Sequence, residues 1–179
     1  MKKTHVSFSE IKTWNECTWK HKLDYIEGIK QFKGNEYTAF GKAIHTVGEV
    51  LVFNDDEKAE DLFESQFLNE LKLLKNDDNT IVFDASLVNN MRTQGLKLAP
   101  QLIPGLEEHF DSYDVVATEE DLMVPIEGTD YKFKGFIDLI IKKDDEYHIL
   151  DWKTCSWGWD SRKKTDRILS YQLTLYKHF

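Results

Sequence analysis

The stretch FIDLIIKKDDEYHILDWKT, Phe136 to Thr154, consists of two apolar runs separated by a short acidic segment. Runs of this kind, rich in Ile, Leu, Phe and Trp, predict two β-strands joined as a hairpin. Both runs are almost continuously apolar, which indicates strands covered on both faces of a sheet. Each run nevertheless contains one aspartate, Asp138 or Asp151. A buried carboxylate needs a partner, so these two residues are the first candidates for a functional site.

A two-residue turn at Asp144 and Asp145 would place Asp138 opposite Asp151, with Cβ atoms about 4.5–5.5 Å apart. Two carboxylates at that distance repel each other unless a cation lies between them, and a divalent ion with oxygen ligands meets that need. Lys153 points to the same face as Asp151, where its charge can stabilise a phosphorane transition state. A three-residue turn would shift the pairing by one residue. A solvated face on an edge hairpin is the simpler alternative, but the apolar runs favour the metal site.

The whole chain is expected to form one domain, residues 1–179, of the α/β (α+β) class. The helical part covers about 1–110 and the sheet-bearing part about 111–179. Ser7 and Glu10 predict a capping box that starts a helix running to about Tyr25. Further helices are predicted over 38–53, 57–75, 86–102 (interrupted near Pro100 and Pro104) and 160–179, and strands over 113–126, 131–143 and 146–154. This order predicts a small central mixed sheet flanked by helices.

Apolar residues at helical spacing predict which side chains of these helices are buried. They are Ile11, Trp14, Leu23 and Ile26; Ala43, Ile44, Val47 and Leu51; Phe63, Phe67, Leu71 and Leu74; Leu87, Met91, Leu98 and Leu102; and Ile168, Tyr171 and Leu175.

Composition excludes several classes of protein. The 179 residues, 41% of them hydrophobic, suffice for one core. No apolar run approaches the ~20 residues of a membrane span, and the first ten residues do not form a signal peptide, so we expect a cytoplasmic protein. The net charge of −9 leaves no global basic footprint. A nucleic acid would therefore have to be held by a local basic patch or by metal ions.

Other candidate residues come from separate segments. His45 lies on a predicted helix, where a lone histidine is more often an ordinary core or surface residue than a metal ligand. Of Glu119 and Glu120, only one can face the same side of the sheet as the aspartates. Gln172 and Tyr176 are four residues apart and so share a face of the last helix, which can be part of a site or ordinary helix surface.

A local basic cluster precedes the last helix, and it is either a phosphate-binding patch or a solvated helix start. The cluster consists of Arg162, Lys163, Lys164 and Arg167. Trp152, Trp157 and Trp159 crowd the segment after the hairpin. Exposed tryptophans can stack on splayed bases, but Trp152 is expected in the core.

Taken together, these segments resemble the PD-(D/E)xK nuclease superfamily, in the branch of RecB-like exonucleases that includes phage and CRISPR-associated enzymes. SFSEIKTWNECTWKHKLDYI resembles the N-terminal helix of that branch, with Thr18 where it often has proline. GKAIH resembles its G-x-x-x-H helix, GFIDLII its G-x-x-D strand, ILDWKT its D-x-K-T strand and YQLTLY its Q-x-x-x-Y helix. All five occur in the family's order, with the two aspartates 13 positions apart.

The resemblance implies a ligand set for Mg²⁺ or Mn²⁺. It consists of His45, Asp138, Asp151 and the backbone carbonyl of Trp152. Lys153 would be the catalytic lysine.

The resemblance also implies roles around this centre. Gln172 and Tyr176 would contact DNA or brace the site. Glu119 would be the upstream catalytic acid, because it lies six residues before Pro125, with Glu120 as the alternative.

The implied fold is a restriction-endonuclease-like core with an N-terminal helical region. The implied reaction is metal-dependent phosphodiester hydrolysis in linear DNA, single- or double-stranded, by an exonuclease of phage or bacterial recombination or repair. A recombination partner protein or a homo-oligomer would complete such an enzyme. One alternative is a nuclease-fold module that binds DNA or protein without cleavage, and a weaker one is a calcium site in the DDE turn.

The sequence departs from the family pattern in two ways. Some relatives bind an iron–sulfur cluster through four cysteines. Cys17 lies near the first of these positions, but nothing resembles the other three, so no cluster is expected. The sequence also stops three residues after Tyr176, whereas relatives usually continue with a further strand and helix. We therefore expect a C-terminally truncated or minimal version.

Overall fold

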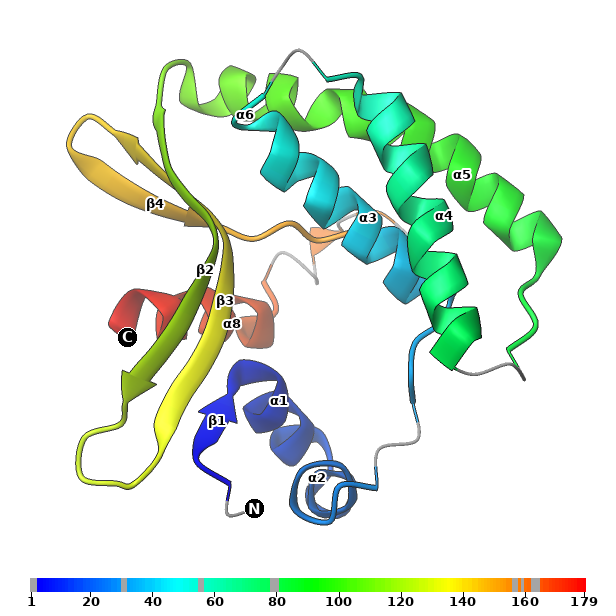
Figure 1. The fold of residues 1–179 in the computed structure, drawn as a ribbon. Coiled ribbons are helices and arrows are strands. Elements are labelled where there is room, and N and C mark those ends of the chain that lie inside the picture. The colour runs from blue at the N-terminus through cyan, green and yellow to red at the C-terminus, as the bar shows by residue number, and fades with distance from the viewer. Residues whose placement is uncertain are drawn as a thin grey trace.

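The computed structural model describes residues 3–29, 32–54, 57–77, 81–155, 158, 160–161 and 165–179. Helices α3 (Glu36–Leu51), α4 (Ala59–Asp77) and α5 (Ala85–Leu98) form one layer of the molecule. The sheet, with α1 (Phe8–Glu16) and α8 (Arg167–His178), lies beside this layer (Figure 1). In chain order the elements are β1 (His5–Ser7), α1 (Phe8–Glu16), α2 (Thr18–His21), the π-helix η1 (Lys22–Ile26), α3 (Glu36–Leu51), α4 (Ala59–Asp77), α5 (Ala85–Leu98), the 3₁₀-helix η2 (Ala99–Gln101), α6 (Leu102–Phe110), β2 (Asp114–Pro125), β3 (Lys132–Lys143), β4 (Glu146–Leu150) and α8 (Arg167–His178). The predicted α/β class with a small mixed sheet is confirmed.

The sheet is built around β3, whose two edges are used differently. On one edge β2 pairs antiparallel with residues 132–142 of β3. The other edge is shared: β1 pairs parallel with residues 132–134 and β4 pairs antiparallel with residues 139–143. None of the described strands pairs with residues 135–138 on that second edge. This gap of four residues contains Asp138.

The β3–β4 hairpin has the predicted register. Asp144 and Asp145 form the turn with φ of 49° and 65°, as a two-residue type I′ turn requires. The ladder runs from the pair beside the turn to the pair Leu139–Leu150. The strand β4 ends at Leu150, so Asp151 lies one position beyond the ladder and opposite Asp138 in register.

The helical layer α3–α5 is apolar at its centre. Phe63 and Phe67 of α4 stack with ring centroids 5.6 Å apart, and Phe40 of α3 packs edge-on against both. The burial predicted from periodicity is confirmed for all eight positions on α3 and α4 and for Met91. It is wrong for Leu98, which is exposed at the end of α5.

The prolines before the sheet act differently from each other. The predicted interruption near Pro100 is confirmed, because η2 separates α5 from α6 there. The interruption near Pro104 is wrong. Pro104 is the third residue of α6, in the first turn, where its missing N–H has no intrahelical partner to lose.

Residues 3–29, which we call the N-terminal arm, do not form the continuous helix that was predicted to reach Tyr25. The backbone turns to φ −160° at Cys17 and separates α1 from α2 and η1. Ser7 caps α1 as expected, accepting a hydrogen bond from the Glu10 N–H. The Glu10 carboxylate does not reach back to complete the capping box. It is buried and pairs with Lys3 and His21, so this arm is anchored by a polar cluster.

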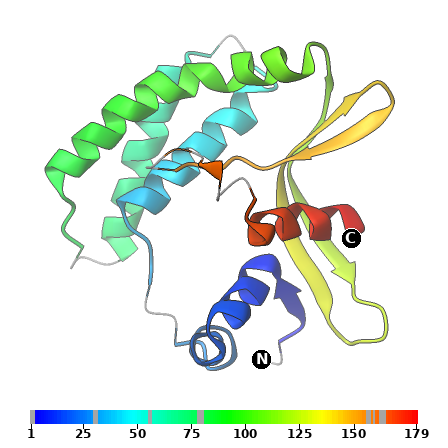
Figure 2. The same cartoon turned by 180° about the vertical axis from the view of Figure 1, so that it is seen from behind.

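The predicted apolar stripe on this arm is also wrong, because Ile11, Trp14 and Ile26 are exposed. Helix α8 lies between the β-hairpins and α1 (Figure 2). Its Leu175 and Tyr176 pack with Phe133 of β3. The side chain of Tyr171, which was predicted to be buried, is 53% exposed. No helix in the described ranges has the length and apolar character needed to cross a membrane.

Candidate active site

Asp138 is the point at which three parts of the chain meet. It lies in the unpaired gap of β3, and its Oδ2 accepts a hydrogen bond of 2.7 Å from the backbone N–H of Trp152. The same oxygen lies 3.2 Å from Nδ1 of His45 on α3. The backbone of the segment after β4 and a histidine from the helical layer therefore converge on one carboxylate.

Two glycines allow α3 to bring His45 to this position. A Cβ at Gly48 would lie 2.8 Å from the indole Nε1 of Trp152, and a Cβ at Gly41 would lie 3.5 Å from Oγ1 of Thr154. Gly41, His45 and Gly48 follow one another at helical spacing, so they share a face of α3. The glycine of the G-x-x-x-H pattern thus has a physical role: α3 can lie directly against residues 152–154.

Asp151 is held by two side chains. Lys153 forms an ion pair with its Oδ2, and Gln172 Nε2 donates a hydrogen bond of 2.9 Å to its Oδ1. The same Gln172 nitrogen lies 3.1 Å from the hydroxyl oxygen of Tyr176 and donates to it. Helix α8 therefore fixes the orientation of the second aspartate through Gln172.

The electrostatics of the site follow from this partial burial. Burial alone would lower the pKa of His45, but its hydrogen bond with Asp138 and the charge of that carboxylate raise the pKa above its ordinary value. Burial raises the pKa of Asp151, and the charge of Asp138 adds to the rise, although Lys153 opposes it. The two acids thus disfavour each other's charge, and each has a cationic partner supplied by the protein.

Glu119 approaches from β2. Its neighbours Thr118 and Glu120 pair with Leu139 and Ile137, the neighbours of Asp138, so Glu119 lies opposite Asp138 on the adjacent strand. Its φ of 47° is unusual within a strand. Its side chain shares a hydrogen bond with Glu49 of α3, which also interacts electrostatically with His45 and Asp138. Both glutamates are exposed, but Glu120 is level with Ile137 whereas Glu119 is level with Asp138 and contacts Glu49, so the geometry favours Glu119 as the acid nearer the site.

Glu49 is a site residue that the sequence analysis missed. Burial and the negative charge of Glu119 raise its pKa to about 7, so Glu49 can hold a proton up to near-neutral pH. The available signal was its spacing: Glu49 follows His45 by four residues and so lies on the same side of the helix. A single acidic residue on a helix does not indicate a site by itself, because its role depends on the residues of β2 that it faces in the fold.

The structure leaves the predicted basic cluster largely undescribed. Arg162, Lys163 and Lys164 lie outside the described residues, as do Trp157 and Trp159. Arg167 is exposed as the first residue of α8. Trp152 packs in the core as expected, and its indole Nε1 is buried with no hydrogen-bond partner among the described residues.

Two hollows open on either side of these residues. One, of about 510 Å³, is lined by Lys153, Gln172 and Tyr176 together with residues of α1 and β3. The other, of about 1020 Å³, reaches Asp151, Trp152 and Tyr176 from the side of α6 and β4. The site is therefore accessible from both sides of Tyr176.

The donor chemistry suits a hard divalent ion, since two carboxylates and an imidazole converge. Within the described ranges, no three or more His, Cys, Asp or Glu residues are grouped so that they would hold a metal ion. The carboxylates instead contact His45, Lys153 and Gln172. The ligand types therefore fit a metal, and its binding would exchange some of these contacts.

A family model described as the PD-(D/E)XK nuclease superfamily matches residues 5–179. The chain belongs to this superfamily, whose members generally use divalent metals such as Mg²⁺ and whose substrate is DNA. Among curated proteins, no sequence matches the chain.

Proposed function

We propose that the protein is a DNase that hydrolyses phosphodiester bonds with Mg²⁺ or Mn²⁺, and that it is an exonuclease of the RecB-like branch acting in the cytoplasm on linear DNA during phage or bacterial recombination or repair. The observation that carries the proposal is the contact between His45 of α3 and Asp138 of β3, with Asp151 near enough to interact electrostatically with both and paired to Lys153. The order and spacing of the five sequence motifs support the choice of branch.

In this proposal His45, Asp138, Asp151 and the carbonyl of Trp152 hold the metal. A metal so held lowers the pKa of a bound water and offsets charge on the scissile phosphate.

The surrounding side chains position the reacting groups. Lys153 supplies a fixed positive charge where negative charge develops on the phosphate, and its ion pair with Asp151 keeps it there. Gln172 fixes Asp151 from the opposite side. Glu49, whose pKa is raised to about 7 by burial and by the charge of Glu119, is a candidate for proton exchange with the leaving group.

The test is incubation with end-labelled linear DNA, single- and double-stranded, and with a covalently closed circle, each in Mg²⁺, Mn²⁺ or EDTA. We expect metal-dependent loss of nucleotides from linear substrates, absent for Asp151→Ala and Lys153→Ala. Asp145→Asn is the matched control, because Asp145 is an exposed acid of the hairpin turn that pairs only with Lys142 among the described contacts.

Cleavage of the closed circle would show an endonuclease instead. Cleavage that survives Asp151→Ala would place the activity elsewhere. If no metal supports cleavage of any substrate, the protein is a binding module on a nuclease fold. Metal binding that survives Asp138→Ala but not Asp145→Asn would identify the calcium site at the turn.

A further inference from the structure

A groove runs from the candidate active site between α1 and α8. Its inner part is the hollow of about 510 Å³ that Lys153 and Gln172 line. This hollow opens at Gly135 and Phe136, where the edge of β3 opposite β2 is not paired by any described strand. Its outer part is a second hollow of about 330 Å³ between α1 and α8. The two share Phe8, Lys12 and Ile168 in their walls, so they adjoin each other, and together we call them the α1–α8 groove.

The charge of this groove differs from that of the molecule. The whole chain carries a net charge of −9, yet no Asp or Glu is found among the described residues that line either hollow. Lys12, Lys134 and Lys153 line it instead. Among the described residues, the ion pair of Lys12 is a long one of 3.9 Å with Glu16 on the exposed side of α1. The groove is thus a locally cationic path that ends at Lys153 and Gln172, the two side chains that contact Asp151, and such a path suits a polyanion.

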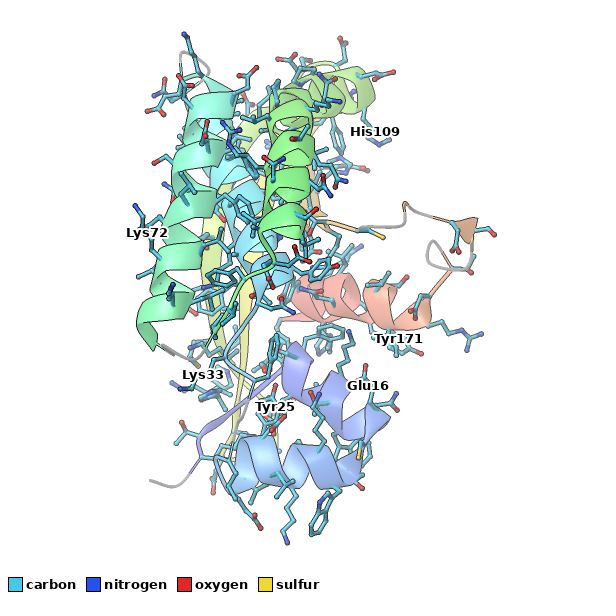
Figure 3. The ribbon with its side chains drawn as sticks, turned by 90° about the vertical axis from the view of Figure 1, so that its right-hand side faces the viewer. Glu16, Tyr25, Lys33, Lys72, His109 and Tyr171 are labelled. Atoms are coloured by element: carbon cyan, nitrogen blue, oxygen red, sulfur yellow. The ribbon has the colours of Figure 1, made fainter. Side chains whose placement is uncertain are left out.

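Exposed aromatic rings are spaced along the same path. Phe136 is 49% exposed, Tyr171 53% and Trp14 55%. Phe136 lies beside the inner hollow with the Lys134 ammonium 5.2 Å from its ring, and Trp14 and Tyr171 line the outer one. Figure 3 shows Tyr171 on the side of α8 that faces α1, whose Glu16 is labelled across from it. Large exposed rings of this kind form part of no described apolar core cluster.

This combination indicates the class of ligand. Cationic side chains that track a backbone, alternating with rings that can stack on bases, are the elements with which proteins bind single-stranded nucleic acid. A duplex hides its base faces within its own stack, so it would use the lysines but not the rings. The rings are therefore explained by an unpaired strand.

We propose that the α1–α8 groove, defined by Lys12, Trp14, Lys134, Phe136 and Tyr171, holds an unpaired DNA strand and leads it to Asp138 and Asp151. This inference deepens the proposed function and rests on it. Lys12 and Lys134 contact phosphates, and Trp14, Phe136 and Tyr171 stack on bases. A double-stranded end would have to be unwound before its strand enters the groove.

The test compares two exposed tryptophans of the N-terminal arm. Trp14 lines the groove, whereas Trp19 is 63% exposed on α2 and does not line either hollow. Binding of a fluorescent oligodeoxythymidylate, longer than the ~4–16 nucleotides that one such surface covers, is measured by anisotropy in EDTA. We expect Trp14→Ala to raise Kd about fivefold or more, since stacking on one base is worth at least that factor. Trp19→Ala should change Kd by less than twofold.

A second pair tests the charge and the opposite wall. Lys12→Ala should weaken single-strand binding and reduce its salt dependence, whereas Lys20→Ala on α2 should do neither. Tyr171→Ala changes the α8 wall and should match Trp14→Ala, which keeps the test informative if Trp14→Ala fails to fold by circular dichroism. The two ring variants, Trp14→Ala and Tyr171→Ala, should bind blunt duplex as the wild type does, because a duplex does not offer its base faces for stacking.

Three results would overturn the groove proposal: equal single-strand binding by wild type, Trp14→Ala and Tyr171→Ala; an equal loss in Trp19→Ala; or preference of the wild type for duplex. These outcomes are separable from those of the cleavage assay. A wild type that cuts duplex ends but binds single strands no better than Trp14→Ala retains the nuclease function and loses the groove. A wild type that binds through Trp14 and Tyr171 but cuts nothing retains the groove and loses the nuclease function.

Discussion

The helical layer and the candidate active site are built on opposite principles, although α3 belongs to both. Toward α4 and α5, α3 presents Ala43 and Val47, which are fully buried against apolar neighbours. Toward the sheet it presents His45 and Glu49. Burial lowers the pKa of His45 but Asp138 raises it overall, and burial together with the charge of Glu119 raises the pKa of Glu49. The layer thus gains stability from packing, while the site places like charges together at a cost in stability. Helix α3 therefore anchors the candidate active site to the packed layer of α3, α4 and α5.

The largest difference between the effect on activity and the effect on stability should come from Asp138→Asn. The variant keeps an oxygen to accept from the Trp152 N–H but loses the charge that faces His45. We expect cleavage to fall about a hundredfold or more, by analogy with the loss of one electrostatic stabiliser. The metal-induced rise in Tm should disappear, since such a rise reports binding to the folded state.

Without metal, the same variant should keep its unfolding free energy within about 1 kcal/mol of wild type, because relief of the repulsion with Asp151 offsets the lost attraction to His45. Thermal melts with EDTA and with Mn²⁺ measure both quantities, with Asp145→Asn as the control. An unchanged Tm shift with Mn²⁺ would remove Asp138 from the ligand set.

The helical layer should show the reverse behaviour. A Cβ at Gly95 would lie 1.9 Å from Cζ of Phe63, so Gly95→Ala must displace a fully buried ring. We expect a loss of about 1–3 kcal/mol in unfolding free energy, with activity per folded molecule unchanged. Gly105→Ala on α6 is the control, because a Cβ there meets nothing within 4 Å. Urea titration measures both, and a large fall in specific activity for Gly95→Ala would mean that the two regions are not independent.

Gly48→Ala should affect both regions at once, to a smaller degree in each. The added Cβ would press on the Trp152 indole, 2.8 Å away, and would shift α3 relative to the segment that carries Lys153. A displacement of reacting groups costs activity steeply, so we expect about a tenfold loss of cleavage with a loss of roughly 1 kcal/mol in stability. If stability falls while the metal affinity and the rate do not, the spacing between α3 and residues 152–154 does not position His45.

The smallest effect is expected from Glu49→Gln, as a change in pH dependence. The pKa of Glu49 is raised to about 7 in the folded protein, so its contribution to stability is fully present below its unfolded pKa and is lost as the pH rises through 7. In EDTA, the Tm of the wild type should therefore fall between pH 5 and pH 8 more than that of the variant. The two proteins should melt alike at the acidic end, and equal pH profiles would contradict the raised pKa.

Sequence patterns predicted the parts of the molecule in which one force dominates. Periodicity alone placed Phe63, Phe67 and Val47 in the core, because burial of apolar surface decides those positions. The acidic dipeptide at Asp144 and Asp145 was enough to predict the hairpin register, since the φ values of a two-residue turn fix the pairing. The aspartates that interrupted the apolar runs pointed to the site.

The sequence patterns failed where a polar contact, or a segment distant in the sequence, determines the burial or the role of a residue. Glu10 is buried where it pairs with Lys3 and His21, whereas the apolar Ile11 and Trp14 of the same helix are exposed. The strand β1 has only three residues, too few for an alternating pattern. Glu49 gains its role only from Glu119, which lies on a strand 70 positions further along the chain.

The divided edge of β3 has a consequence for self-association. An open strand edge normally invites another chain to add to the sheet, and a site that needs main-chain groups exposed would carry that hazard. Here β1 and β4 occupy the two ends of the edge and leave only residues 135–138 open between them. This unpaired segment of four residues, flanked by β1 and β4, is too short for a strand of another chain to pair with it. This edge of β3 can thus stay open at the candidate site without offering a template for an added strand.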